Sequence, residues 1–534
     1  MIQTGPNILE QKIHFFAEKF PQKIAIKGDI IADSKIDNNF TYQQLLIEID
    51  SISDVLQLSV NKYQTFALIM NNHPAWAILD LALMFKLQCC VPLPAFFSTD
   101  QTRHSILDAN VDHLLIECDV DGTPKQDINN FLEEYFQPGI KISIANKQLF
   151  FFSLKSKYKV RQPDENRIQK ITYTSGTTDK PKGVMLSQQA IMTKVEALAE
   201  ASEANENDIA LSILPLSTLL ENIAGLYVPL YCGAQTTLLS PQSIGISGSS
   251  QIDAKQLMST LYAYQPSVFI IIPQLLLLFI NLLKSAYKLP DSIRFIAMGG
   301  APIAKDLLLM AQQLDIPVFE GYGLSEASSV VAVNTASNYR IGSVGKILKT
   351  HQIKLSADSE ILIKDHLFDG YLNKNNHISD DYYATGDIGE VDEDGFIYIT
   401  GRKKNIINTA YGRNISPEWI EKELEAIPMV SQSLIYGHGK PFLVALVVLR
   451  IIPNLTHEEI ISQLEQSLVL INSKLPDYAS ITNYIEIVEP FSIQNNQLTG
   501  TGRPRREVIY ETYENNLNLY YANYGEFIME KLSE

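Results

Sequence analysis

Residues 171–187 read ITYTSGTTDKPKGVMLS, a run of small hydroxylated and glycine residues that follows a probable strand and includes Lys180 and Lys182. Successive backbone N–H groups in a Gly/Ser/Thr turn form a concave anion site, and the hydroxyls add donors. Lysine supplies a point charge for phosphate. The spacing differs from the common phosphate loop, because Gly176 and Gly183 lie seven residues apart and Lys182 precedes the second glycine. The stretch therefore predicts an anion-binding turn of another kind.

Further motifs occur in order along almost the whole chain. They are FTYQQL (40–45), GGAP (299–302), EGYGLSEAS (320–328), GSVGK (342–346), YATGDIG (383–389), GRKKNII (401–407) and YGRNISPEWIE (411–421). Together with the opening stretch they resemble, nearly residue for residue, the signatures of the adenylate-forming superfamily, the AMP-dependent synthetases and ligases. One such motif is weak support, whereas this many in the right order is strong support.

The resemblance implies a two-step reaction. A carboxylate attacks the α-phosphate of ATP to give an acyl-adenylate and pyrophosphate, and a thiol then displaces AMP. The protein mainly positions the reactants and stabilises charge around the phosphates. Glu326 would ligate Mg²⁺, a hard cation that prefers oxygen ligands. The residues that would hold the β- and γ-phosphates are Thr174, Ser175, Gly176, Thr177, Thr178 and Lys182.

The same resemblance assigns the rest of the nucleotide site. Tyr322 would stack on adenine, and Ser325 would reach the α-phosphate or the substrate carboxylate. Asp387 and Arg402 would hydrogen-bond the ribose hydroxyls. The remaining candidates for cofactor contacts are Gly300 and Ala301 on the other side of adenine, Gly323 beside Tyr322, and Gly412 in the loop that would line the pantetheine channel.

The resemblance also implies a C-terminal domain that rotates between the two half-reactions about Lys404. In the family a lysine of this domain serves adenylation, but QLTGTGRPRREVI (497–509) places Arg503 at that position. Arginine keeps the positive charge as a planar group with five donors. Two further departures are Thr218 for a histidine and Asn405 for an aspartate. Arg503, Glu326, Ser325 and Lys182 are the candidate catalytic residues.

The elements that must position these residues alternate along the chain. FALIM (66–70) predicts a strand, AWAILDLALMFKL (75–87) a helix and CCVPLP (89–94) the next strand, and the alternation continues to about residue 320. We therefore expect an α/β fold with helix-covered parallel sheets. From residue 341 short strands and turns predict a small β-rich subdomain.

These patterns predict two domains. Residues 1–403 would form a large N-terminal domain of two helix-covered sheets plus the β-rich subdomain, which binds ATP and the acyl group. Residues 404–534 would form a small, mobile α+β domain. Its first helix is expected in SPEWIEKELEAI, with Ser416 as the cap and Pro417 at the first position.

Composition limits the function classes. The net charge of −17 over 534 residues argues against a general nucleic-acid binder. The four cysteines show no metal-ligand spacing and suit a reducing compartment. The N-terminus lacks the order of a signal peptide. The apolar segment 268–283 is interrupted by Pro273 and predicts a buried strand and helix rather than a membrane span. We expect a cytoplasmic protein, and peripheral membrane contact stays open.

We expect an ATP-dependent acid–thiol ligase that uses ATP, Mg²⁺ and CoA. The segments LPLSTLLEN (214–222), with Glu221, and YGRNISPEWIE resemble the long-chain fatty acyl branch more than the aryl or amino-acid branches. Carrier-protein phosphopantetheine remains an alternative acceptor, which would make the chain an acyl-carrier-protein ligase. A nucleotide-binding protein whose adenylation is impaired by Arg503 is the alternative from another class.

Overall fold

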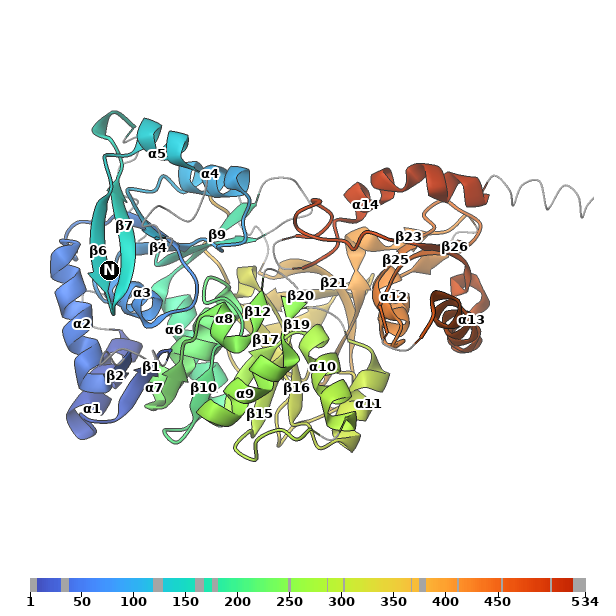
Figure 1. Cartoon of the computed structure of the whole chain (residues 1–534), viewed down its shortest axis with the longest axis horizontal. Coiled ribbons are helices and arrows are strands. Elements are labelled where there is room, and N and C mark those ends of the chain that lie inside the picture. Colours follow the sequence, from blue (N-terminus) through green and yellow to red (C-terminus); the bar gives the residue numbers. More distant parts are fainter. Residues whose placement is uncertain are drawn as a thin grey trace, which may run out of the picture.

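The computed structural model shows a large N-terminal domain with a smaller C-terminal domain at one end of it (Figure 1). The large domain contains two extended sheets and a four-stranded sheet, after which the chain enters the C-terminal domain. The structure describes residues 7–29, 38–118, 128–158, 168–174, 181–247, 251–285, 287–300, 303–365, 367–373, 381–410, 413–452, 455–499 and 502–521.

The first extended sheet has nine strands and a parallel centre. In spatial order they are β18 (Lys346–Ile347), β17 (Ser329–Val333), β16 (Val318–Leu324), β15 (Phe295–Met298), β14 (Val268–Ile271), β10 (Ile209–Leu211), β11 (Gln235–Thr237), β1 (Ile24–Lys27) and β2 (Asn39–Thr41). The strands from β16 to β1 are parallel. The outer strands β17, β18 and β2 pair in the antiparallel direction.

The second extended sheet has seven strands and is built in the same way. In spatial order they are β6 (Ile140–Ile144), β7 (Lys147–Ser153), β5 (His113–Glu117), β3 (Thr65–Ile69), β4 (Cys89–Pro92), β8 (Lys170–Thr174) and β9 (Lys182–Leu186). The strands from β5 to β8 are parallel, and antiparallel pairs close both edges. Parallel central strands buried on both faces explain the nearly continuous apolar runs in the sequence.

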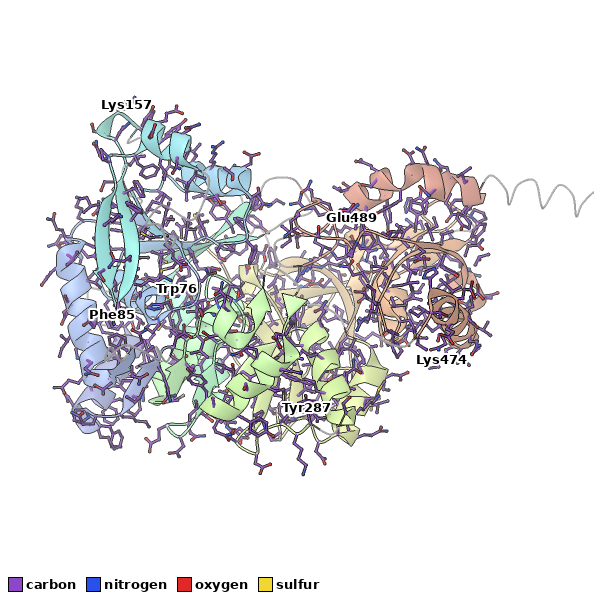
Figure 2. The ribbon with its side chains drawn as sticks, in the orientation of Figure 1. Trp76, Phe85, Lys157, Tyr287, Lys474 and Glu489 are labelled. Atoms are coloured by element: carbon purple, nitrogen blue, oxygen red, sulfur yellow. The ribbon has the colours of Figure 1, made fainter. Side chains whose placement is uncertain are left out.

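Helices cover both sheets. They are α1 (Ile8–Lys19), α2 (Tyr42–Val55), α3 (Pro74–Phe85), α4 (Thr99–Asp108), α5 (Asn129–Tyr135), α6 (Gln188–Ala201), α7 (Val228–Cys232), α8 (Pro241–Ile244), α9 (Ala254–Tyr264), α10 (Pro273–Lys284) and α11 (Lys305–Gln313). Every residue of α3 is buried, and Trp76 and Phe85 mark its two ends inside the large domain (Figure 2). A helix that is apolar all round is expected in such a central position.

The buried helix α3 carries a charged residue that links it to the second sheet. Asp80 of α3 accepts a 2.8 Å hydrogen bond from the ammonium of Lys170, the first residue of β8, and both side chains are 1% exposed. Lys170 also donates to Asn222 and Tyr227 at 2.6 and 2.9 Å. These two residues lie on the π-helix η2 (Glu221–Tyr227). A buried ion pair of this kind is tolerated because further hydrogen bonds satisfy both charges.

The third part of the large domain and the C-terminal domain contain shorter sheets. The four-stranded antiparallel sheet comprises β19 (Gln352–Leu355), β20 (Glu360–Lys364), β21 (Tyr383–Val391) and β22 (Ile397–Arg402). Two small hairpins are β12 (Ile246–Ser247) with β13 (Gln251–Ile252) and β23 (Ile407–Asn408) with β24 (Asn414–Ile415). The C-terminal domain packs α12 (Pro417–Glu425), α13 (His457–Lys474) and α14 (Arg506–Thr512) with β25 (Val430–Tyr436), β26 (Leu443–Leu449) and β27 (Ile481–Glu486).

The structure confirms the predicted fold class and most of the predicted elements. The strand expected at 66–70 is β3, and the helix expected at 75–87 is α3. The apolar segment 268–283 forms β14 and α10, whose inner face belongs to a hydrophobic core. None of the helices in the described part of the chain combines the length and apolar character that crossing a bilayer requires.

One predicted helix cap is wrong in its mechanism. Ser416 occupies the position before α12, but its hydroxyl makes no capping hydrogen bond to the helix backbone. It donates instead to the carbonyl of Thr400 on β22, at 2.6 Å. The side chain therefore ties α12 to the last strand of the large domain, because its hydroxyl donates to a tertiary carbonyl and accepts no hydrogen bond from the helix backbone.

Candidate active site

The predicted phosphate turn connects two paired strands of the seven-stranded sheet. β8 ends at Thr174 and β9 begins at Lys182, and these residues are antiparallel partners. Lys182 therefore lies at the base of the turn. Outside the described residues lie the side chain of Thr174 and the predicted phosphate contacts Ser175, Gly176, Thr177 and Thr178.

Lys182, Tyr371 and Glu326 come together at this turn although they are far apart in the sequence. The Lys182 ammonium lies 5.7 Å from the centre of the Tyr371 ring. The Tyr371 hydroxyl donates a 2.6 Å hydrogen bond to Oε1 of Glu326 and lies 3.2 Å from the hydroxyl of Tyr383. Burial, and then the charge of Glu326, raise the pKa of Tyr371, so its hydroxyl remains a donor. The Lys182 ammonium and the Glu326 carboxylate thus both lie next to the Tyr371 side chain.

Backbone hydrogen bonds position Tyr371 and Glu326. The N–H of Leu372 donates to the carbonyl of Gly183 on β9 at 2.8 Å. Glu326 lies in the short helix η3 (Ser325–Ala327), and its carbonyl accepts from the N–H of Phe368 at 2.9 Å. The loop that carries Tyr371 is therefore fixed to the phosphate side at one end and to the Glu326 helix at the other. The predicted residue Ser325 begins the same short helix.

Tyr322, Asp387 and Arg402 form the second cluster of the site. Asp387 and Arg402 are cross-strand partners on β21 and β22, and Arg402 Nε lies 2.6 Å from Asp387 Oδ1. The Tyr322 hydroxyl donates to Asp387 Oδ2, also at 2.6 Å. Burial raises the pKa of Asp387, while Arg402 and the Tyr322 hydrogen bond oppose that rise. Each carboxylate oxygen still has a second lone pair, so Asp387 retains capacity to accept from a ligand hydroxyl.

The motif glycines Gly323 and Gly300 are required for different structural reasons. Gly323 lies against β17, where an added Cβ would be 2.1 Å from the carbonyl oxygen of Ser329. Close strand packing alone therefore requires glycine at position 323. Gly300 has a φ of +88°, and nothing lies within 4 Å of where its Cβ would be. The backbone at Gly300 thus needs glycine for its conformation and leaves open space beside it.

Arg503 reaches this open space from the C-terminal domain. Its Nε donates a 3.3 Å hydrogen bond to the carbonyl oxygen of Gly300. Desolvation and the charge of Arg402 lower the pKa of Arg503, whereas Asp387 and Glu326 raise it. Arg503 therefore lies on the exposed side of Gly300, within reach of the charges of Asp387, Arg402 and Glu326. The predicted neighbour Ala301 lies outside the described residues.

The predicted hinge lies between the two domains. Lys404 belongs to the short helix η4 (Lys403–Asn405), and burial, then Arg402 and Arg503, lower its pKa. The side-chain amide of Asn405 donates to Oε1 of Glu418 on α12 at 2.5 Å. An aspartate at position 405 would set two carboxylates against each other, so asparagine suits this contact. Gly412 lies outside the described residues.

Glu326 fits the predicted role of a magnesium ligand. Within the described ranges, no three His, Cys, Asp or Glu side chains gather as a metal site. A single carboxylate is still sufficient for Mg²⁺ that arrives with a nucleotide, because Mg²⁺ retains waters and takes substrate phosphates as ligands. The hydrogen bond from Tyr371 to Oε1 fixes the orientation of the Glu326 carboxylate. The donor set therefore suits a nucleotide-bound divalent cation rather than a metal caged by protein.

Two features of the site were not predicted from the motifs. Tyr371 lies in a loop between motifs, where no residue pattern distinguishes it from a core tyrosine. Tyr383 begins the YATGDIG motif, but the motif alone does not show that it faces Tyr371. Thr218, which stands in place of a histidine, donates to the carbonyl of Pro215 at 2.7 Å and so is engaged within its own turn.

Comparison with known proteins agrees with this architecture. The chain matches the family model described as AMP-binding enzyme over residues 13–367. It matches a second model, the AMP-binding enzyme C-terminal domain, over residues 404–525. The first match alone covers more than half of the chain.

Individual relatives share low sequence identity over most of their length. A long-chain-fatty-acid–CoA ligase of Mycobacterium bovis is 24% identical over 84% of this chain and 86% of its own. A 2-succinylbenzoate–CoA ligase of Bacillus anthracis is 28% identical over 82% of this chain and 86% of its own. The two relatives are named for acids of different chemical classes.

A solved structure shares the fold. It is O-succinylbenzoate coenzyme A synthetase from Bacillus subtilis in complex with AMP, with a TM-score of 0.69 and 20% identity. The match covers 94% of this chain and 98% of that one. The fold and the two family models confirm the resemblance drawn from the motifs. The chain belongs to the AMP-binding enzyme family and is an AMP-forming ligase of the adenylate-forming superfamily.

Proposed function

We propose that this enzyme activates a carboxylic acid, specifically a long-chain fatty acid, as an acyl-adenylate and then transfers the acyl group to CoA. The observation that carries the proposal is the contact between Arg503 and Gly300. This contact brings a cation of the C-terminal domain to the site on the large domain. That site consists of two groups of side chains. We call Lys182, Tyr371 and Glu326 the phosphate cluster, and Tyr322, Asp387 and Arg402 the ribose cluster.

In the first half-reaction an oxygen of the acid carboxylate attacks the α-phosphorus of ATP, and the bond to pyrophosphate breaks. Lys182 would neutralise charge on the β- and γ-phosphates, and Asp387 and Arg402 would hold the ribose. Arg503 would bridge the carboxylate and the α-phosphate, where negative charge is shared in the transition state. Ser325 would contact the α-phosphate or the incoming carboxylate.

The metal and the remaining nucleotide contacts belong to the same proposal. Glu326 would hold Mg²⁺, which supplies charge neutralisation to the phosphates when bound. Tyr322 would present its ring to adenine, with Gly300 and Ala301 on the other side. The turn residues from Thr174 to Thr178 would supply N–H and hydroxyl donors to the phosphates.

A fatty acid is supported by two observations. The segment LPLSTLLEN, with Glu221, resembles the fatty acyl branch, and several relatives are named long-chain-fatty-acid–CoA ligases. A relative named for 2-succinylbenzoate makes an aromatic acid the second arm of the test. CoA is the proposed acceptor because the names of these relatives specify CoA. A carrier-protein thiol is the alternative acceptor, and the cytoplasm is the expected compartment.

A panel of acids, scored by pyrophosphate release with and without CoA, tests the proposal. The panel should contain saturated fatty acids of several lengths, an aryl acid such as 2-succinylbenzoate, and an amino acid. We expect ATP- and Mg²⁺-dependent pyrophosphate release with long-chain fatty acids, and formation of the acyl-CoA when CoA is present.

Each alternative has its own outcome in this panel. Release with the aryl acid alone would replace the fatty acid in the proposal. Acyl-adenylate that reacts with a phosphopantetheinylated carrier protein but not with CoA would make the enzyme a carrier-protein ligase. Nucleotide binding without acid-dependent pyrophosphate release from any member would indicate that adenylation is impaired. Glu326→Gln is the matched control, because it removes the charge of the proposed metal ligand and keeps the side-chain size.

A further inference from the structure

The turn that follows β10 is held by two side chains that are distant in sequence. We use the word turn for residues 212–220, which comprise an irregular stretch from 212 to 218 and the first helical residues, 219 and 220, before the π-helix η2. The side-chain amide of Asn72 donates to the carbonyl of Leu214 at 2.8 Å, and its oxygen accepts from the N–H of Leu216 at 2.7 Å. Oε2 of Glu221 accepts from the N–H of Leu214 at 3.3 Å. We call Asn72 and Glu221 the turn clamp.

Both members of the clamp are buried, so their hydrogen bonds are not readily replaced by water. Asn72 is 6% exposed and Glu221 is fully buried. Gly225 makes room for the Glu221 carboxyl group, because a Cβ at that position would lie 2.1 Å from Glu221 Oε1. A buried polar group left without its partner costs free energy. The clamp therefore restricts the turn to one backbone conformation.

The clamp connects the two extended sheets. Asn72 follows β3 of the seven-stranded sheet and directly precedes His73, the residue before α3. The turn that it holds leaves β10 of the nine-stranded sheet. A side chain from one sheet thus sets the backbone at the carboxyl end of a strand in the other sheet.

The turn lies at the site, on the side away from the ribose cluster. In parallel sheets ligands bind outside the carboxyl ends of the strands. β10, β14, β15 and β16 are parallel neighbours in that order, so the turn after β10 lies two strands from Gly299 and three from Tyr322. Leu220, the last residue of the turn, reaches to 3.8 Å from where a Cβ of Gly299 would be.

We propose that Asn72 and Glu221 are positioning residues for the acid substrate, because they fix the 212–220 turn as the wall of the acid-binding side. The assignment of that side to the acid rests on the proposed function. The candidate nucleotide contacts Gly300, Tyr322 and Asp387 lie toward β15, β16 and β21, which leaves the β10 side for the acid. Neither clamp residue touches the reacting atoms, so each acts through the turn.

The protonation state of the Glu221 carboxyl group guides the choice of test variants. Burial raises the pKa of Glu221 to about 8, so the neutral acid predominates near neutral pH. Glutamine reproduces the neutral group and still offers a carbonyl oxygen to the N–H of Leu214. Glu221→Gln should therefore retain the turn, whereas Glu221→Ala should release it.

The test compares KM for the acid with KM for ATP, using the full chain. We expect Asn72→Ala and Glu221→Ala to raise KM for the acid on the order of 10-fold and to change KM for ATP less than about 2-fold. Glu221→Gln should have the same KM values for the acid and for ATP as the unaltered chain. Asn472→Ala is the matched control, because Asn472 holds the backbone of Ile481 in the C-terminal domain by the same pair of hydrogen bonds, both at 2.8 Å.

Hydrogen–deuterium exchange provides a readout that does not depend on activity. The N–H of Leu216, which donates to Asn72, should exchange faster in Asn72→Ala, and the N–H of Leu214, which donates to Glu221, should exchange faster in Glu221→Ala. Protection around Ile481 should stay unchanged in both variants. Equal increases in both KM values, or the same change in Asn472→Ala, would overturn the acid role. Unchanged exchange at the turn in an active Asn72→Ala chain would overturn the clamp itself.

Failure of the proposed function gives a separate result. An unaltered chain that releases no pyrophosphate with any acid would overturn the proposed function and with it the acid role of the turn. If Asn72→Ala fails to fold, Glu221→Ala and Glu221→Gln are compared instead. Only Glu221→Ala removes the oxygen that accepts from the N–H of Leu214.

Discussion

Arg503 and Gly300 are joined across the domain boundary, with Arg503 Nε donating to the Gly300 carbonyl oxygen at 3.3 Å. A second contact between the domains pairs Lys474 of α13 with Asp306 of α11 at 3.6 Å. The C-terminal domain therefore presents Arg503 to the large-domain site. This is the arrangement that adenylation requires if Arg503 replaces the lysine of the family.

Replacement of Arg503 should affect one half-reaction only. Arg503→Ala should slow acyl-adenylate formation on the order of 10²-fold, as loss of one transition-state donor does. Transfer from preformed acyl-adenylate to the thiol should be nearly unchanged, because the proposed rotation of the C-terminal domain would remove the guanidinium from the site. Single-turnover kinetics of each half-reaction checks this.

Arg503→Lys is the sharper variant, since it restores the residue usual in the family and should retain or raise activity. The neighbouring Arg505 is only 4% exposed. Because it is buried, a substitution of Arg505 is a poorer control for the loss of one arginine than a substitution of an exposed residue. Adenylation by Arg503→Ala at the unaltered rate, or equal slowing of both half-reactions, would contradict the assignment.

Loss of the Glu326 charge should impair adenylation while the fold persists. Glu326→Gln keeps an oxygen that can accept from the Tyr371 hydroxyl, so the local hydrogen bond at 2.6 Å has a substitute. We expect pyrophosphate release to fall on the order of 10²-fold or more, because the proposed metal ligand loses its charge. The measurement is pyrophosphate release over a range of Mg²⁺ concentrations.

Tyr371→Phe separates orientation of the carboxylate from its charge. It keeps the ring beside Lys182 and removes only the donor to Glu326. We expect a smaller loss of pyrophosphate release than in Glu326→Gln, together with a higher Mg²⁺ requirement.

The assignment of Glu326 has its own contradicting outcome. Full activity of Glu326→Gln at saturating Mg²⁺ would remove Glu326 from the site.

Lys182 should distinguish ATP from AMP. Its position at the base of the phosphate turn would direct its charge at the β- and γ-phosphates, which AMP lacks. Lys182→Ala should weaken ATP binding about 10- to 100-fold and AMP binding less than about 2-fold. Calorimetric titration with each nucleotide measures the difference. Equal weakening for both nucleotides would contradict the assignment to the terminal phosphates.

A buried lysine should make stability depend on pH. Lys194 of α6 is 1% exposed, contacts His351 Nε2 and donates to the carbonyl of Val330. Burial lowers its pKa from 10.5 to about 7. Between these two values the unfolded chain binds more protons than the folded one, so the free energy of unfolding attributable to Lys194 rises as pH increases through this window.

Lys194→Met isolates this contribution, because methionine fills much of the same space without a charge. Denaturant unfolding of both chains between about pH 7 and 10 should show the unaltered chain gaining up to ~1.4 kcal/mol per pH unit relative to the variant. A constant difference between the two chains across this window would show that the Lys194 ammonium does not titrate there.

Local patterns in the sequence were sufficient for most of the fold. Alternating apolar segments predicted β3, α3 and β14 because burial on both faces demands continuous apolar side chains. The motifs predicted Tyr322, Asp387 and Arg402 as nucleotide contacts; the structure brings the three side chains into contact with one another, and their roles toward a nucleotide stay predictions.

Contacts between distant segments were decided only by the tertiary structure. Ser416 has the local pattern of a cap, yet its hydroxyl donates to the carbonyl of Thr400 on a nearby strand and accepts no hydrogen bond from the helix backbone. Tyr371 acquires its partners Lys182 and Glu326 only when its loop pairs with β9. Asn72 and Leu216 meet only because the two sheets pack together. A hydrogen bond between residues far apart in sequence leaves no periodic or local signature, so it appears only when folding has set the distance.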